Sequence, residues 1–125
     1  MKRFFLLTLA SAALLGASAA PVKTYEVKSP DGRLALVLTA GERLSFTVAR
    51  DGETLVAPSE MALTLSTGEV LGESPRVRSA RRRAVTETID APLYRQSRFD
   101  AAYNELDLRL RGDYGILARA YDDGV

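Results

Sequence analysis

Apolar and polar side chains alternate with a period of two along most of the chain after its first twenty residues. Such alternation places one side of a β-strand in a core and the other side in water. Residues 106–111 are the clearest case, because leucines occupy one face and charged side chains occupy the other. The segments that predict strands are residues 33–39, 44–48, 61–65, 106–111 and 115–121.

Turn signals separate these segments at intervals of roughly ten residues, the spacing typical of sandwiches and barrels. In tight turns glycine can adopt positive φ, and proline fixes its own φ at the value that the first central position requires. The predicted turns are residues 30–32, 40–42, 51–52, 67–68 and 112–115. No segment sustains a helical stripe over three turns. The fold class predicted for residues 20–125 is therefore all-β, an antiparallel β-sandwich.

The stretch from residue 74 to residue 98 is the least regular. It contains the run Arg81, Arg82 and Arg83, followed by weak alternation that predicts an edge strand over residues 84–90. A charge run is most often a solvated strand face or a loop. Two further interpretations are a contact to an anion or polysaccharide, and an edge that arginines guard against pairing with another molecule.

The first twenty residues have the layout of a secretory signal peptide. A basic start with Lys2 and Arg3 precedes an apolar stretch over residues 4–15, which is expected to be helical. Small residues follow, and we predict a signal peptide of residues 1–19 with cleavage between Ala19 and Ala20. The apolar stretch is shorter than the roughly 20 residues of a spanning helix, so no membrane span is expected after cleavage. The protein is therefore expected to be exported, either periplasmic or secreted.

Charge and composition narrow the chemistry of the remaining chain. The whole chain carries a net charge of +1, and loss of Lys2 and Arg3 leaves 15 basic and 16 acidic residues. That balance argues against a nucleic-acid partner. The chain contains no cysteine and no histidine. Their absence excludes disulfides, the common zinc, iron–sulfur and copper sites, and the Ser-His-Asp and Cys-His nucleophile arrangements within these residues. A calcium site built from carboxylates stays open.

The last residues predict a turn directly after a strand. Asp122, Asp123 and Gly124 form the turn signal, and Val125 begins what reads as a returning strand. A hairpin with one arm leaves backbone groups unpaired. We therefore expect residues 20–125 to be a domain that is incomplete at its C-terminal end and part of a longer protein.

Several segments, in order, resemble the N-terminal domain of glycoside hydrolase family 97, a family of α-glucosidases and α-galactosidases. The match begins with the Ser-Pro-Asp-Gly turn at residues 29–32, ahead of an apolar strand. Ser59 before residues 61–65 is similar to the family's serine followed by a Leu-Gly-Leu strand. The Tyr-Asn-Glu-Leu segment at residues 103–106 and the Tyr-Asp-Asp-Gly turn at residues 121–124 complete the resemblance. Met61 and Ala62 depart from the family's usual Leu-Gly, and residues 76–100 match poorly.

The resemblance implies an N-terminal β-sandwich followed in cis by a (β/α)8 barrel and a C-terminal β domain. It implies a carbohydrate substrate and calcium at the active site of the parent protein, with no cofactor expected in residues 20–125. The catalytic carboxylates would sit in the barrel. No catalytic, metal or substrate-binding residue is therefore assigned in this sequence.

The carboxylates of the chain have simpler interpretations than catalysis. Asp31, Asp122 and Asp123 read as turn residues. By parity Glu105 falls on the face opposite Leu106, where it is expected to be solvent-facing or to anchor a loop. An alternative is a contact with the barrel, and on that interpretation Tyr103, Asn104 and Glu105 are the candidate domain-interface residues.

The function expected from the sequence is the non-catalytic N-terminal sandwich of an exported α-glycosidase. An alternative from another class is a stand-alone exported β-sandwich that binds carbohydrate or protein.

Overall fold

The structure is a computed structural model that describes residues 21–90, 92, 93, 95 and 98–125. These residues contain strands and no helix, and none of them forms a helix that could cross a membrane. The predicted signal peptide and its cleavage site between Ala19 and Ala20 lie outside the described residues. The strands are β1 (Lys23–Lys28), β2 (Leu34–Ala40), β3 (Leu44–Arg50), β4 (Glu53–Glu60), β5 (Leu63–Thr64), β6 (Val70–Leu71), β7 (Val77–Asp90), β8 (Arg98–Leu110) and β9 (Gly115–Tyr121).

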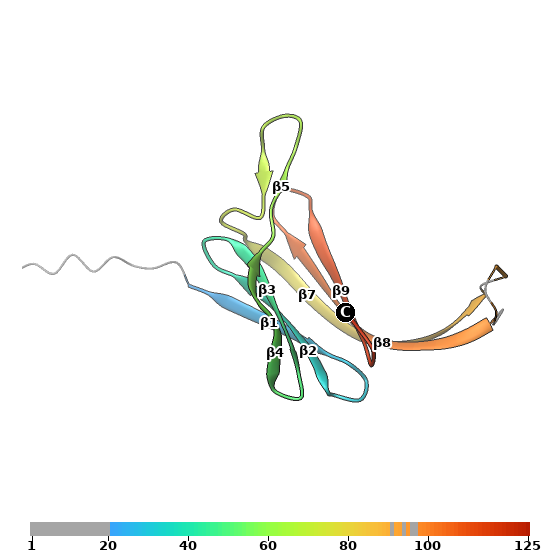
Figure 1. Ribbon diagram of the computed structural model, residues 1–125. Helices are drawn as coiled ribbons and strands as arrows, with labels where there is room; N and C mark the ends of the chain where they lie inside the picture. Colours follow the sequence, from blue (N-terminus) through green and yellow to red (C-terminus); the bar gives the residue numbers. More distant parts are fainter. Residues whose placement is uncertain (1–20, 91, 94, 96–97) are drawn as a thin grey trace, which may run out of the picture.

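The strands form two antiparallel sheets that pack face to face, as Figure 1 shows. The first sheet has the order β1-β2-β3-β4, so each strand pairs with its neighbour in sequence. The second has the order β7-β8-β9. Strands β5 and β6 pair with each other as a separate short hairpin. The predicted all-β, antiparallel β-sandwich is confirmed.

The core lies between the two sheets and follows the predicted alternation. On β8 the leucines at positions 106, 108 and 110 are fully buried, and they face apolar side chains of β1, β2 and β3. Burying each such leucine contributes roughly 1.5–3 kcal/mol. The buried core residues are Val27, Leu34, Leu36, Leu38, Val48, Leu106, Leu108, Leu110, Ala118 and Ala120.

The predicted strand over residues 61–65 is wrong in length. Only Leu63–Thr64 are in a strand, and Leu63 is 60% exposed. The backbone N–H of Met61 donates to the carbonyl of Leu44 instead, at 2.8 Å. Strand β5 pairs with only two residues of β6. The alternating segment therefore has no long neighbouring strand, and it forms only a short one.

The irregular stretch also differs from expectation. Strand β7 runs unbroken over 14 residues and includes the arginine run, so the loop interpretation of the arginines is wrong. It pairs with β8 from Val77 opposite Leu110 to Asp90 opposite Arg98, and it is an edge strand as predicted. Strand β9 pairs with β8 only between Tyr103 and Arg109. Residues 86–90 and 98–102 therefore form a two-stranded extension, the distal ribbon, which projects beyond the sandwich in Figure 1.

Candidate functional site: the outer face of the second sheet

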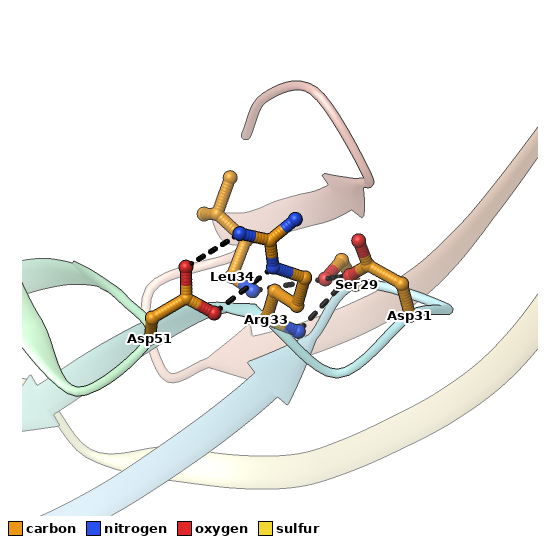
Figure 2. A network of polar contacts seen from close by, with 5 residues as sticks. All are labelled: Ser29, Asp31, Arg33, Leu34 and Asp51. Atoms are coloured by element: carbon orange, nitrogen blue, oxygen red, sulfur yellow. Dashed lines mark hydrogen bonds and ion pairs between the residues drawn. The ribbon is translucent and has the colours of Figure 1, made fainter.

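The Ser-Pro-Asp-Gly turn is held by its own side chains (Figure 2). The buried Ser29 hydroxyl accepts the N–H of Leu34 at 3.0 Å and donates to Asp31 Oδ1. Asp31 Oδ1 also accepts a hydrogen bond from the N–H of Arg33 at 3.0 Å. These hydrogen bonds, the one from Ser29 first, hold the pKa of Asp31 below its ordinary value. Asp31 is a turn residue, as predicted.

Two further carboxylates connect this turn to its neighbours. The Arg33 guanidinium donates twice to Asp51, from Nε to Oδ1 at 3.0 Å and from Nη2 to Oδ2 at 2.8 Å (Figure 2). Asp122 Oδ1 accepts the N–H of Asp31 at 2.9 Å. The contacts tie together three turns of the sandwich, and Asp122 itself lies in the bend that follows β9.

Glu105 lies on the face of β8 opposite Leu106, as parity predicted, but its solvent-facing interpretation is wrong. Only 2% of the residue is exposed. Arg83 on β7 and Arg119 on β9 lie directly across from it in the sheet. Arg83 Nε donates to Oε1 at 2.5 Å, and Arg119 Nε donates to Oε2 at 2.9 Å. The two guanidiniums cover the carboxylate and remove it from water.

Arg83, Glu105 and Arg119 form a row across the three strands, and the electrostatics of this row exclude Glu105 as a general acid. The hydrogen bond from Arg83 holds the pKa of Glu105 below its ordinary value, and burial opposes that shift. Glycoside hydrolysis needs one carboxyl group that stays protonated. Glu105 is held ionised, and each of its oxygens already accepts a hydrogen bond from an arginine. Its role in this arrangement is to cross-link three strands.

Tyr103 lies beside this row on the same face and is also buried. Its ring contacts the ring of Tyr121 on β9, with centroids 4.9 Å apart. The Arg119 guanidinium sits over the Tyr103 ring, 4.9 Å from its centroid, in cation–π geometry. Burial is the main cause that raises the pKa of Tyr103. The sequence analysis did not select Tyr121 or Arg119, since only the register of β9 brings them to this face.

Asn104 points to the other face of β8. Its Nδ2 donates to the carbonyl of Lys28 at 2.8 Å, and Arg82 Nε donates to the carbonyl of Glu26 at 3.0 Å. Both carbonyls belong to β1, the edge strand of the first sheet. Arg82 thus gives the Glu26 carbonyl a hydrogen-bond partner on β1. The structure brings Tyr103 and Glu105 together on the outer face and places Asn104 at the seam between the sheets.

The carboxylates of the described residues do not fit a calcium site. Nowhere in residues 21–90, 92, 93, 95 and 98–125 do three or more Asp, Glu, His or Cys side chains gather in a group that could hold a metal ion. Calcium takes six to eight oxygen ligands, whereas Asp31, Asp51 and Glu105 are engaged by protein donors.

Comparison with known proteins identifies the family of this chain and finds its fold in solved structures. A family model described as Glycosyl-hydrolase 97 N-terminal matches residues 27–125. A retaining alpha-galactosidase of Bacteroides thetaiotaomicron is 37% identical over 103 residues, which are 82% of this chain and 16% of that protein. This chain therefore spans a small part of the length of that relative.

Solved structures agree on the fold. Two structures of a glycoside hydrolase family 97 enzyme from Pseudoalteromonas sp. strain K8, in complex with acarbose and with panose, each match with a TM-score of 0.71 at 15% identity. Each match covers 78% of this chain and 16% of the enzyme. On the strength of the family match over residues 27–125, this chain belongs to the N-terminal domain family of glycoside hydrolase family 97.

Proposed function

We propose that this chain is the non-catalytic N-terminal sandwich of a glycoside hydrolase that cleaves α-glycosidic bonds in oligosaccharides. The observation that carries the proposal is the family match over residues 27–125. The state of Glu105 supports the non-catalytic part, because its carboxylate is ionised and occupied by two arginines. The relatives named above are an alpha-galactosidase and a family 97 enzyme bound to acarbose or panose.

The chemistry belongs to a (β/α)8 barrel in cis, which binds the carbohydrate substrate. Barrel enzymes carry their catalytic residues at the C-terminal ends of the strands. The calcium that the family resemblance implies is assigned to that catalytic domain. The sandwich supports the barrel and contributes no reacting group.

The protein is exported by the signal peptide of residues 1–19. The order of basic start, apolar stretch and small residues supports cleavage between Ala19 and Ala20. Mass spectrometry of the protein recovered from the periplasm or medium of an expressing bacterium tests this step. A mature N-terminus at Ala20 is expected, and a retained Met1 in the exported protein would contradict it.

Hydrolysis assays on the complete protein test the function. The complete protein is expected to release nitrophenol from nitrophenyl α-galactoside or nitrophenyl α-glucoside. It is expected to leave the corresponding nitrophenyl β-glycosides intact. Chelation followed by calcium addition is expected to remove and restore this activity. A folded complete protein that binds oligosaccharide but hydrolyses no α-glycoside would favour the stand-alone binding module instead.

A further inference from the structure

Aspartate precedes glycine three times in the chain, at residues 31–32, 51–52 and 123–124. Such pairs are chemically labile, because glycine has no Cβ to shield its nitrogen. The glycine nitrogen attacks Cγ of the protonated aspartic acid, the Cγ–OH bond breaks, and water leaves as a succinimide ring closes. Water then adds to either ring carbonyl and gives aspartate or isoaspartate, in which the main chain runs through Cγ. Each pair is therefore a candidate site of spontaneous modification.

The first pair is held at both of its reacting groups. Asp31 Oδ1 accepts hydrogen bonds from the Ser29 hydroxyl and from the N–H of Arg33 (Figure 2). The N–H of Gly32 donates to the carbonyl of Ser29 at 2.9 Å. Ring closure has to break these bonds before the nitrogen reaches the carboxyl carbon. The same donors lower the pKa of Asp31, so the protonated form that loses water is scarce.

The second pair is held through its carboxylate. Arg33 Nε donates to Asp51 Oδ1 at 3.0 Å, and Nη2 donates to Oδ2 at 2.8 Å (Figure 2). Both oxygens are bound by one planar group, so the side chain cannot turn toward the Gly52 nitrogen without losing both bonds. The hydrogen bond from Arg33 also lowers the pKa of Asp51. Arg33 thus restrains two pairs, the first through its main chain and the second through its side chain.

The third pair lies in the turn after β9, where the hydrogen bonds involve other groups. Asp122 Oδ1 accepts the N–H of Asp31 at 2.9 Å, and the Gly124 carbonyl accepts the N–H of Tyr121 at 2.7 Å. Asp123 is exposed. Within the part of the chain that the structure describes, no donor holds the Asp123 carboxylate.

We infer that Asp123 is a site of spontaneous isoaspartate formation, and that Ser29 and Arg33 protect the other two Asp–Gly pairs from the same reaction. The contrast rests on which carboxylates are bound by donors, since all three pairs have the same intrinsic chemistry. Hydrogen bonds to a charged group are among the stronger ones in proteins, and breaking even one slows a reaction by roughly tenfold or more.

The modification has a structural consequence at this turn. Isoaspartate at residue 123 inserts one extra carbon into the main chain between Tyr121 and Gly124, whose hydrogen bond spans the turn. The neighbouring Asp122 carries the contact to the N–H of Asp31. The reaction therefore loosens the connection between the turn after β9 and the Ser-Pro-Asp-Gly turn.

Incubation of the complete protein in heavy-oxygen water at neutral pH tests the inference. Each passage through the succinimide adds one heavy oxygen, and peptide mass spectrometry measures the label at each pair. Each rate is divided by the rate in the urea-unfolded protein, which removes intrinsic differences. Asp123 is expected to take up label roughly tenfold or more faster than Asp31 and Asp51. Equal rates at the three pairs, or a slower rate at Asp123, would overturn the inference.

Two variants assign the cause. A Cβ at Gly124 would meet no atom within 4 Å, so Gly124→Ala is expected to fold normally, and its methyl group shields the nitrogen. It should lose the label at Asp123 alone. Arg33→Ala should raise the rate at Asp51 toward that at Asp123 and leave Asp123 unchanged. An unchanged rate at Asp51 would contradict the protecting role of Arg33. These readouts do not depend on the hydrolysis of α-glycosides, so they stand or fall separately from the proposed function.

Discussion

The two ends of strand β8 place their larger apolar side chains on opposite faces. From Leu106 to Leu110, every second side chain enters the core between the sheets, and the other face carries charges. At the other end, Arg98 and Asp100 occupy the even-numbered face, and Phe99 lies on the outer side. Alternation is thus a property of each segment and of what covers it. Beyond the end of its own sandwich, a strand is no longer held to the alternation that the core imposes.

The largest effect is expected from the core face at the sandwich end. Leu108→Ala removes a fully buried side chain, and such truncations cost about 2–5 kcal/mol because a cavity remains. Pulse proteolysis in urea measures the loss in the complete protein. Asp100→Ala, on the same face of the strand but in the distal ribbon, is the control and is expected to cost less than about 0.5 kcal/mol. Similar losses for the two variants would remove the contrast between the two ends.

A smaller effect is expected from Glu105→Gln, because Arg83 and Arg119 can regain water when the charge is lost. The folded-state pKa of Glu105 is lowered, so its stabilising contribution is present above the ordinary value of 4.5. It disappears as the pH falls through the lower folded-state pKa. The stability difference between the unsubstituted protein and the variant should therefore be full at neutral pH and shrink below about pH 4.5.

Urea unfolding at a series of pH values measures that difference. Glu69→Gln removes the same charge from an exposed position between β5 and β6, and it serves as the control. A loss at neutral pH no greater for Glu105→Gln than for Glu69→Gln would show that the buried arginine row adds nothing to stability.

Asn104→Ala is expected to have the next largest effect. It should lower the unfolding free energy by about 1 kcal/mol, because it removes the hydrogen bond to the Lys28 carbonyl. This residue marks the point on β8 where the first sheet ends. Thr86→Ala, on the polar face of the distal ribbon, is the control and should cost less than about 0.5 kcal/mol. Chemical unfolding of both variants is sufficient, and equal costs would place the boundary between the two ends elsewhere.

The smallest effect is expected from Arg98→Ala. Its ion pair with Asp90 is exposed on both sides, and exposed pairs contribute about 0–1 kcal/mol. A change in unfolding free energy below about 0.5 kcal/mol is predicted by the same unfolding measurement. A loss approaching that of Leu108→Ala would mean that the polar face of the distal ribbon is itself a covered surface.

The sandwich was predictable because its leucines alternate and its turns carry glycine. Asp51 and Gly52 both adopt positive φ in the two-residue turn between β3 and β4, where the sequence predicted a hairpin. Strand β4 was not predicted, since its sequence contains Pro58 and its conformation depends on pairing with β3. The full length of β7 likewise depends on its pairing with β8.

The candidate site was predictable only in part. Parity placed Glu105 on the correct face, but its burial depends on arginines 22 and 14 residues away in the chain. Those partners are set by strand register, which turns and pairing determine. The separation of Asn104 from Tyr103 and Glu105 follows directly from alternation, and three consecutive residues of a strand cannot share one face.

Hydroxyl-radical footprinting of the complete, unsubstituted protein tests the central claim most directly. Leu108 at the sandwich end of β8 is fully buried, and Leu93 in the turn beyond β7 is 96% exposed. Oxidation of each side chain is normalised to the unfolded protein. A core between the two sheets predicts that Leu108 is oxidised at least tenfold more slowly than Leu93. Similar oxidation rates for the two leucines would contradict the claim that the even-numbered face of β8 is the core of the sandwich.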